Sequence, residues 1–415
     1  MRHMLQLRFA PRALVVCFAV LAHAACAGDA PPRSSAALVV DSAGIEIVTS
    51  DALGSDRRCG LADRPTLSLG TVEGDEAFML FFVRGANRLS DGSLAVLNNS
   101  SGEIRIFTRA GTHLRSMGGH GDGPGEFRIG RFIWVLPGDT LWVGDYRPWR
   151  YHIYSARGAF IRTVDLDPPY LNASRGGGVL ANGVSVNVQR PFLGPTNDFR
   201  QPEPWSVEAH DVDGTLMREL LRLDGVRRGT WEGAGVIMST LFDPTPSIVA
   251  AGATIAISTA REPEVQILDG DFTLRRIVRW SDPDREVTAA HIRGYRDALV
   301  ERRGGRGSEN WSAADESLVS DRRPTADLFP ATEGLMLGRD GRLWVRRYRR
   351  PGDDVRWMAF GSGGEFQCHL TMDTSLTVYE FGADYLLAVH MDELEVERVV
   401  EYELHPSSEP SGSQP

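Results

Sequence analysis

Two clusters of arginine and aromatic residues could bind a ligand. They occupy Tyr146–Arg150 and Arg346–Arg350, and each follows a short apolar run. Arginine binds carboxylates through paired hydrogen bonds, and arginine together with aromatic rings also suits sugars or a protein partner. We therefore predict a ligand- or partner-binding surface formed by Arg147, Trp149, Arg150, Arg347, Tyr348 and Arg349. The alternative is that both segments are solvated loops.

The segment Gly121–Phe127, with the sequence Gly-Asp-Gly-Pro-Gly-Glu-Phe, could in principle cradle a phosphate group. Such a cradle needs a following helix or a lysine. Here a strand-like run follows, and the chain contains no lysine. Because glycine allows positive φ and Pro124 fixes its own φ, we interpret the segment as a structural connector. Asp145 and Arg150 beyond it are expected to form an ion pair within one repeat rather than a catalytic pair.

The composition narrows the functional classes further. All 45 basic residues of the 415-residue chain are arginine, so neither a Schiff-base lysine nor a P-loop lysine is possible. The formal net charge of -10 repels phosphate backbones and argues against nucleic acid as a partner. The sequence also lacks a Gly-x-Ser-x-Gly elbow and any zinc-like spacing of cysteine and histidine.

A repeated pattern indicates the elements that must position these side chains. A turn is followed by a β-rich run of three residues and then by one or two further strand-like segments. Leu94 and Leu141 are 47 residues apart, and Leu343 and Leu387 are 44 apart. A four-stranded propeller blade uses about 40–50 residues, so the pattern predicts an all-β fold, a six-bladed β-propeller. The six runs are 94–96, 141–143, 184–186, 255–257, 343–345 and 387–389.

Some segments fall outside this pattern. Ala36–Val48 and Thr66–Leu69 look like strands, and we expect one or both to complete the last blade, which would close the ring and remove exposed edges. The spacing of apolar residues predicts a helical insertion over 285–302, approached through Asp282-Pro283. The polar stretch from there to Ala331 is expected to be a loop.

The glycine-rich segment and the residues after it resemble one repeat of the NHL type, a unit of many β-propellers. Pro148 departs from the pattern, which usually carries asparagine there, and Ile129-Gly130 replaces an expected proline. The whole chain resembles bacterial exported six-bladed β-propeller proteins, which are often lipoproteins. The residues that carry the resemblance are Gly121, Gly123, Pro124, Gly125, Phe127, Leu141, Val143, Asp145, Arg150, Gly158 and Phe160.

Two functional classes follow from this resemblance. The first is a non-catalytic binding propeller on the bacterial cell envelope, with its ligand at one mouth of the central channel. The second is a calcium-dependent lactonase-like hydrolase, in which acidic and amide oxygens from several blades hold the metal. In that alternative the calcium ligands would be Asn98, Asp145 and Asn187, each just past a β-rich run. We favour the first class, with a protein or small-molecule partner and no cofactor.

The N-terminus predicts export and a lipid anchor. Arginines precede the apolar run Ala13–Ala22, which is too short for a comfortable membrane span, and small residues follow it. Ala24-Ala25-Cys26 resembles the end of a bacterial lipobox, so Cys26 is the predicted lipidation site. The alternative is ordinary cleavage after Ala22-His23-Ala24. The predicted organisation is a signal peptide at 1–26, a flexible tether at 27–36, the propeller at 37–405 and a disordered tail at 406–415.

The mature chain would retain two cysteines, Cys59 and Cys368. Two cysteines in an exported chain suggest a disulfide. Such a bridge would tie the start of the propeller to its end, as ring closure requires. The alternative is two unpaired buried thiols.

Overall fold

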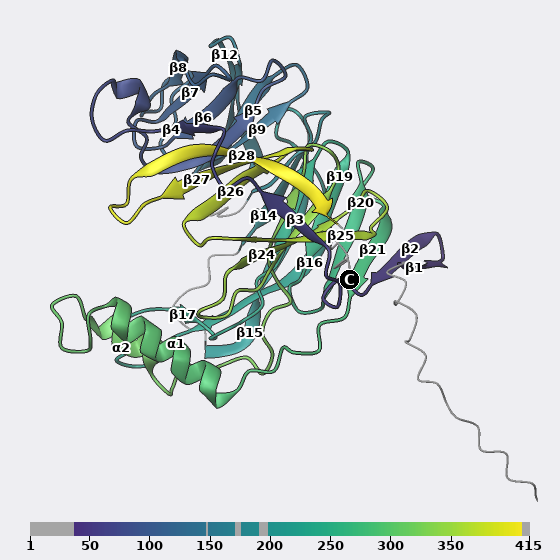
Figure 1. The fold of residues 1–415 in the computed structure, drawn as a ribbon, viewed down its shortest axis with the longest axis vertical. Coiled ribbons are helices and arrows are strands. Elements are labelled where there is room, and N and C mark those ends of the chain that lie inside the picture. Colours follow the sequence, from purple (N-terminus) through teal and green to yellow (C-terminus); the bar gives the residue numbers. More distant parts are fainter. Residues whose placement is uncertain (1–36, 147, 171–175, 191–197, 409–415) are drawn as a thin grey trace, which may run out of the picture. The chain divides into compact units, whose positions relative to one another are not determined.

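The computed structural model describes residues 37–146, 148–170, 176–190 and 198–408, which form a fold built almost entirely of strands (Figure 1). The predicted signal peptide, Cys26, the tether and Arg147 lie outside these residues. Within them, no helix has both the length and the apolar character needed to cross a membrane.

Most of the described strands form antiparallel units of four, which we number as blades 1 to 6 in chain order. Blades 1 to 3 contain β5 (Val83–Arg88), β6 (Leu94–Asn98), β7 (Glu103–Phe107) and β8 (His113–Gly118); β9 (Gly130–Leu136), β10 (Thr140–Asp145), β11 (Trp149–Ser155) and β12 (Phe160–Tyr170); and β13 (Gly176–Val179), β14 (Ser185–Gln189), β15 (Asp198–His210) and β16 (Leu216–Gly229). Blades 4 to 6 contain β18 (Ser247–Ala251), β19 (Thr254–Ser258), β20 (Glu264–Asp269) and β21 (Leu274–Trp280); β22 (Thr332–Leu337), β23 (Leu343–Arg347), β24 (Val355–Phe360) and β25 (Phe366–Met372); and β26 (Leu376–Phe381), β27 (Tyr385–Met391), β28 (Glu397–Ser408) and β4 (Leu67–Leu69).

Each predicted β-rich run lies in or at the start of the second strand of its blade, where neighbouring blades cover both faces. In β6, Leu94 and Val96 pack with Leu387 of blade 6, whereas Ala95 packs with Leu141 of blade 2. Because successive side chains of a strand point to opposite faces, a strand buried on both faces needs apolar residues without alternation. This explains why five of the six runs are uniformly apolar, whereas the run 184–186 contains the buried Ser185.

The N-terminal strand β4 supplies the fourth strand of blade 6. It pairs antiparallel with β28, with Leu69 opposite Val399. The prediction that Thr66–Leu69 completes the last blade is therefore confirmed. β28 itself continues to Ser408, which pairs with Arg58, so the first three residues of the predicted tail belong to a strand.

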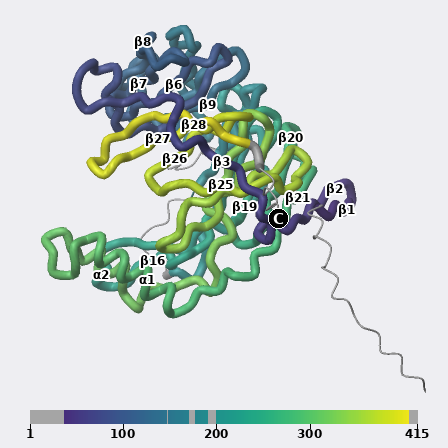
Figure 2. Tube along the Cα trace, viewed as in Figure 1, coloured from purple at the N-terminus to yellow at the C-terminus, as the bar shows by residue number. Residues whose placement is uncertain are grey.

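The other N-terminal strands lie along outer strands of blades 4, 5 and 6. β2 (Ile45–Ser50) pairs in parallel with β21 of blade 4, and β1 (Leu38–Ser42) forms a hairpin on it, so Ala36–Val48 does not complete the last blade. β3 (Arg58–Leu61) lies between β25 of blade 5 and β28 of blade 6. Figure 2 shows this purple segment beside the yellow C-terminal strand.

The predicted disulfide is present between Cys59 on β3 and Cys368 on β25. The two Cα atoms are 5.5 Å apart, and both side chains lie in the apolar core between blades 5 and 6. The bridge therefore fastens the N-terminal segment to blade 5.

The insertion between blades 4 and 5 contains two helices, α1 (Ala289–Arg302) and α2 (Ala313–Val319). α1 begins four residues later than predicted, because Val287 bonds to the carbonyl of Asp327 and Thr288 then caps the helix. α2 lies in the stretch predicted to be a loop. Its capping box, formed by Ser312 and Asp315, is the sequence signal that was missed.

The insertion also has its own small apolar cluster. Leu241, Phe242 and Phe329 form its buried part, with Tyr295 of α1 and Tyr348 of blade 5 packed against them. β17 (Met238–Ser239), before blade 4, pairs with β16, and Leu241 just after it forms a β-bridge to Thr325 of the insertion, so the insertion is joined to blade 3 as well as blade 5.

Candidate functional site

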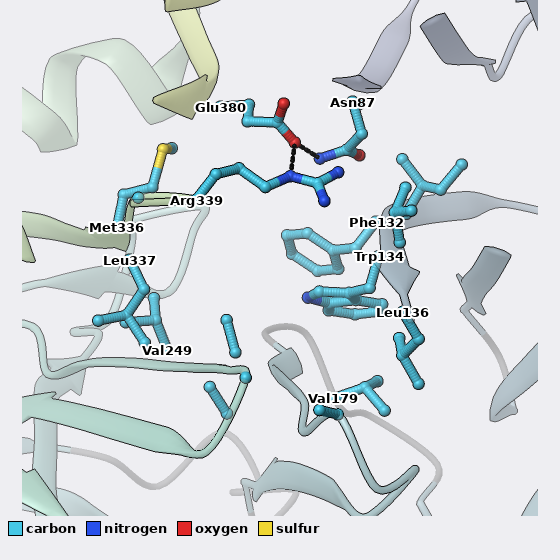
Figure 3. A pocket seen from close by; sticks show the side chains of 18 of the residues that line it. Asn87, Phe132, Trp134, Leu136, Val179, Val249, Met336, Leu337, Arg339 and Glu380 are labelled. Carbon is cyan, nitrogen blue, oxygen red and sulfur yellow. Dashed lines mark hydrogen bonds and ion pairs between the residues drawn. The ribbon is translucent and has the colours of Figure 1, made fainter. Parts of the chain in front are cut away.

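A channel of about 740 Å³ lies between the first strands of the six blades (Figure 3). Residues from β5, β9, β13, β18, β22 and β26 all contribute to its wall. Small residues stand where these strands approach one another most closely. A Cβ added at Gly85 of β5 would come within 2.4 Å of the Cγ2 atom of Ile133, so this position requires glycine.

One side of the channel is an aromatic and aliphatic wall. Phe132, Trp134 and Leu136 are alternate residues of β9, so their side chains point to the same face of that strand. The residues between them, Ile133 and Val135, also line the channel and pack toward blade 1, whereas the other three pack toward blade 3. Val249, Met336 and Leu337 line the channel from blades 4 and 5, as Figure 3 shows.

A buried carboxylate, Glu380 of β26, anchors a polar group at the channel. Its two oxygens accept hydrogen bonds from Asn87 Nδ2 at 2.9 Å, Arg339 Nε at 2.9 Å, the Arg88 backbone N–H at 3.1 Å and the Tyr385 hydroxyl at 2.6 Å. Burial, followed by the charge and hydrogen bond of Glu380, raises the pKa of Tyr385 far above its ordinary value. The Arg339 side chain reaches across the channel beside the rings of Phe132 and Trp134 (Figure 3).

The channel wall also contains an arginine without a carboxylate partner. Arg84 of β5 forms no ion pair with any of the residues that the structure describes, and its guanidinium lies 5.6 Å from the ring centre of Phe82. Ser90 lies at the turn after β5, and Asp139 lies at the turn after β9. The backbone N–H and the hydroxyl of Ser90 donate hydrogen bonds to the Asp139 carboxylate. The channel therefore combines an apolar body with a few polar groups, as small-molecule sites commonly do.

The first predicted arginine–aromatic cluster is only partly at the surface. Trp149 is 1% exposed, and its Nε1 donates to Asn187 Oδ1 at 2.9 Å. It is a core residue, because its ring fills the space between blades 2 and 3. Arg150 is mostly buried and forms ion pairs with Asp145 at 3.1 Å and Asp122 at 3.5 Å, so the predicted ion pair within the repeat is present.

The second predicted cluster lies at the end of β23 and meets the insertion. Arg347 Nη2 lies 3.5 Å from the buried carboxylate of Asp282, and Tyr348 stacks on Phe329. Arg349 is exposed to solvent. In the part of the chain that the structure describes, no hydrogen bond or ion pair joins this cluster to the first one. A binding role for these residues stays a prediction.

Among the described residues, no hydrogen bond joins the three residues proposed as calcium ligands to one another. Asn98, Asp145 and Asn187 are all fully buried, and each is bonded within its own blade or to the blade beside it. Asn98 accepts from the Phe81 N–H at 2.9 Å, and Asn187 accepts from the Tyr151 hydroxyl at 2.6 Å. Over the described ranges, no group of three or more His, Cys, Asp or Glu side chains is placed to hold a metal ion.

The glycine-rich segment is tied into the core of blade 2. Phe127 is fully buried, and Tyr154 donates its hydroxyl to the Gly125 carbonyl at 2.8 Å. The Glu126 carboxylate folds back to accept from the Gly123 N–H at 3.0 Å. These contacts agree with the interpretation of Gly121–Phe127 as a connector between blades 1 and 2.

Sequence reasoning missed the residues of the channel wall. The run Phe132–Leu136 carries a usable signal, because aromatic and aliphatic residues fill every position of a segment directly after the connector. Glu380 carries no such signal, since its partners Asn87 and Arg339 are distant in the sequence.

Comparisons with known proteins agree with this architecture. A Bacteroides fragilis protein described as exported is similar over 87% of this chain and 100% of its own, at 12% identity and a TM-score of 0.50. The fold is an all-β propeller. A DUF4221 family member from Bacteroides vulgatus covers 85% of this chain and 100% of its own at 9% identity, with a TM-score of 0.47. Regucalcin, a calcium-binding protein from Agrobacterium tumefaciens, covers 81% and 95% at 10% identity, with a TM-score of 0.38.

At these identities the similarity concerns the fold alone. No family model matches the chain, and no curated protein matches it. The predicted propeller is therefore confirmed, and the chemistry has to be argued from the residues of this chain.

Proposed function

We propose that this protein is a non-catalytic binding propeller whose six blades close into one ring and whose ligand lies in the central channel. The ligand is a small molecule with an apolar body and a polar group. The observation that carries this proposal is the channel of about 740 Å³, within the usual range of ligand pockets, with aromatic and aliphatic walls and a polar group around Glu380.

The polar residues of the channel support binding rather than catalysis. Glu380 accepts four hydrogen bonds, and two of its donors, Asn87 and Arg339, also line the channel. A carboxylate held in this way is well placed to orient neighbouring donors and poorly placed to exchange a proton with a ligand. Its role in this proposal is to fix Arg339 and Asn87 in the position where they meet the polar end of the ligand.

The same proposal places the protein in the bacterial cell envelope, anchored through Cys26. Three observations support this location: the signal-like N-terminus, the Cys59–Cys368 disulfide and the similarity to a Bacteroides fragilis protein described as exported. Mass spectrometry of the mature protein tests the anchor, because a lipidated Cys26 would be the new N-terminal residue.

A neutral apolar dye, N-phenyl-1-naphthylamine, tests the channel. We expect saturable binding to the purified protein, detected as a rise in dye fluorescence. The variant Val249→Trp places a large side chain in the channel and should weaken binding at least about tenfold. Leu114→Trp is the matched control, because Leu114 is 46% exposed on β8 and does not line the channel. Absence of saturable binding, or equal loss in both variants, would contradict the proposal.

A further inference from the structure

A second, smaller cavity lies where the insertion meets blade 5. Its volume is about 10 Å³, and it shares no lining residue with the central channel. Asp282 and Arg285 lead from β21 toward α1, whereas Arg347 and Arg350 follow β23. Two aromatic residues, Phe329 and Tyr348, also line this cavity.

Positive charge at this cavity exceeds what the one buried carboxylate can neutralise. The Asp282 side chain is 4% exposed and forms an ion pair with Arg347 Nη2 at 3.5 Å. Charge-assisted hydrogen bonds are normally about 2.7–2.9 Å long, so this pair is loose. Burial raises the pKa of Asp282 even though Arg347, Arg285 and Arg350 all favour its charged form.

The three guanidinium groups retain donors for another group. Arg285 is 7% exposed and donates one hydrogen bond, from Nη1 to the Arg261 carbonyl at 2.7 Å. Arg350 donates to the backbone carbonyl of Asp284 and lies 4.8 Å from the ring centre of Phe329. A guanidinium has five N–H donors, and each of these arginines uses one of them toward the described residues.

The size and walls of the cavity select the shape of the anion. A cavity of about 10 Å³ holds roughly one water-sized group, so one oxygen of a planar carboxylate fits and a whole tetrahedral anion does not. Tyr348 is partly exposed and stacks on the buried Phe329, with ring centres 5.7 Å apart, so Tyr348 offers an apolar surface beside the arginines. A carboxylate attached to an apolar group would satisfy both parts of the site.

We propose that this cavity binds a carboxylate, with one oxygen entering between Arg285, Arg347 and Arg350 and the attached apolar group lying against Tyr348. The carboxylate belongs to a small organic acid or to the C-terminus of a chain, and both present the same group to the arginines. The site is independent of the channel and would bind its ligand even if the channel binds none.

Isothermal titration calorimetry with phenylacetate tests the proposal, with phenylacetamide as the neutral control. We expect saturable binding of phenylacetate and none of phenylacetamide. Arg347→Gln should weaken binding about tenfold, the effect of losing one hydrogen bond between charged groups. Arg356→Gln is the matched control, because Arg356 is exposed on β24 of the same blade and does not line the cavity.

Asp282→Asn supplies a change in the opposite direction. Removing the competing negative charge should tighten phenylacetate binding several-fold, a result that a merely damaged fold cannot produce. The peptide acetyl-Gly-Gly-Phe, with a free or an amidated C-terminus, distinguishes the two sources of the carboxylate, which are a small organic acid and the C-terminus of a chain. Binding of the free peptide alone assigns chain ends, binding of phenylacetate alone assigns organic acids, and either supports the site.

Three results would overturn the proposal. The first is that neither phenylacetate nor the free peptide binds the wild-type protein saturably. The second is that phenylacetamide binds as well as phenylacetate. The third is that Arg356→Gln weakens binding as much as Arg347→Gln, or that Asp282→Asn weakens it.

Discussion

Asp145 and Asn98 occupy the same place at the ends of the second strands of neighbouring blades, and they make the same contact. Asn98 Oδ1 accepts from the Phe81 N–H, and Asp145 Oδ1 accepts from the N–H groups of Arg128 and Ile129 at 3.1 and 2.8 Å. In both blades the acceptor holds the loop that enters the first strand. The repeated polar residue is therefore a clamp on backbone donors that would otherwise be buried without a partner.

The charge of Asp145 is stabilised in the folded state. Burial alone would raise its pKa, but the His152 ring at 3.5 Å and hydrogen bonds from Ile129, Arg128 and Arg150 outweigh burial and lower the pKa below its ordinary value. A carboxyl whose pKa is depressed on folding contributes stability above its unfolded pKa of about 4, and this contribution is lost as the pH falls through the folded value.

Asp145→Asn should therefore lower the free energy of unfolding by about 3 kcal/mol at pH 7, because it leaves Arg150 and buried donors without their charge partner. The difference from the wild-type protein should shrink as the pH falls below about 4. Urea unfolding across this pH range measures both effects. Asp122→Asn is the control, since Asp122 is 57% exposed and should cost at most about 0.5 kcal/mol.

Calcium provides a separate check on the same residue. If Asp145 serves only as a clamp, excess calcium and a chelator should give the wild-type protein the same unfolding midpoint. A calcium-dependent rise in the midpoint that disappears in Asp145→Asn would instead support the hydrolase alternative.

Residue-level predictions succeeded where the partner was local. Asp145 and Arg150 are five residues apart, and their ion pair could be expected from the sequence. Trp149 could not be placed, because a tryptophan between arginines looks the same in a solvated loop and at the start of a strand. Its acceptor, Asn187, belongs to the next blade and is 38 residues away.

At the scale of elements, the short N-terminal strands hold blades 5 and 6 together. β3 pairs with β25 and with β28, and the Cys59–Cys368 bridge adds a covalent link to the first of these. The loop closed by the disulfide spans 309 residues. Cross-linking so distant a pair removes a large amount of conformational freedom from the unfolded chain.

The variant Cys59→Ala/Cys368→Ala should therefore lose about 3–5 kcal/mol of unfolding free energy. Guanidinium unfolding monitored by tryptophan fluorescence provides the measurement. Chemical reduction of the wild-type protein should give the same midpoint as the double variant. An unchanged midpoint in both would show that strand pairing alone fixes β3.

The strands themselves were more predictable than their partners. Both N-terminal segments have strand-like sequences, yet β4 completes blade 6 and β2 joins blade 4. Edge strands carry no sequence mark of the strand that they will meet, because the backbone groups that pair are the same everywhere. The start of α1 was misplaced for a similar reason, since the pairing of Val287 with Asp327 is a tertiary contact.

At the scale of the whole molecule, the N-terminal segment supplies strands that pair with the outer strands of blades 4, 5 and 6. β1 is exposed at every residue, so removing residues 1–42 should change the melting temperature by no more than a few degrees. Removing residues 1–69 takes away β2, β3, β4 and one cysteine of the disulfide. Circular dichroism melting should then show no cooperative transition near the wild-type temperature. A cooperative transition in the shorter chain would show that blade 6 is stable with three strands.

The channel is also a property of the whole molecule, because its wall comes from strands that are far apart in the sequence. For this reason the sequence did not predict it. Its wall needs one strand from each of six blades, and Phe132, Val249 and Met336 become neighbours only once those blades are placed. The repeat pattern predicts how many such strands exist. It does not predict which of their side chains face the centre.

The position of β3 also sets an order of events during biosynthesis. Cys59 leaves the ribosome 309 residues before Cys368, an interval of about 15–60 s at ~5–20 residues per second. Throughout that interval β3 and β4 exist without the strands that they pair with in the finished protein, whereas β2 can pair with β21 as soon as blade 4 has been made. The nascent chain therefore cannot complete its fold in order from its beginning to its end, because β3 and β4 must stay unpaired and unaggregated until blades 5 and 6 have been made.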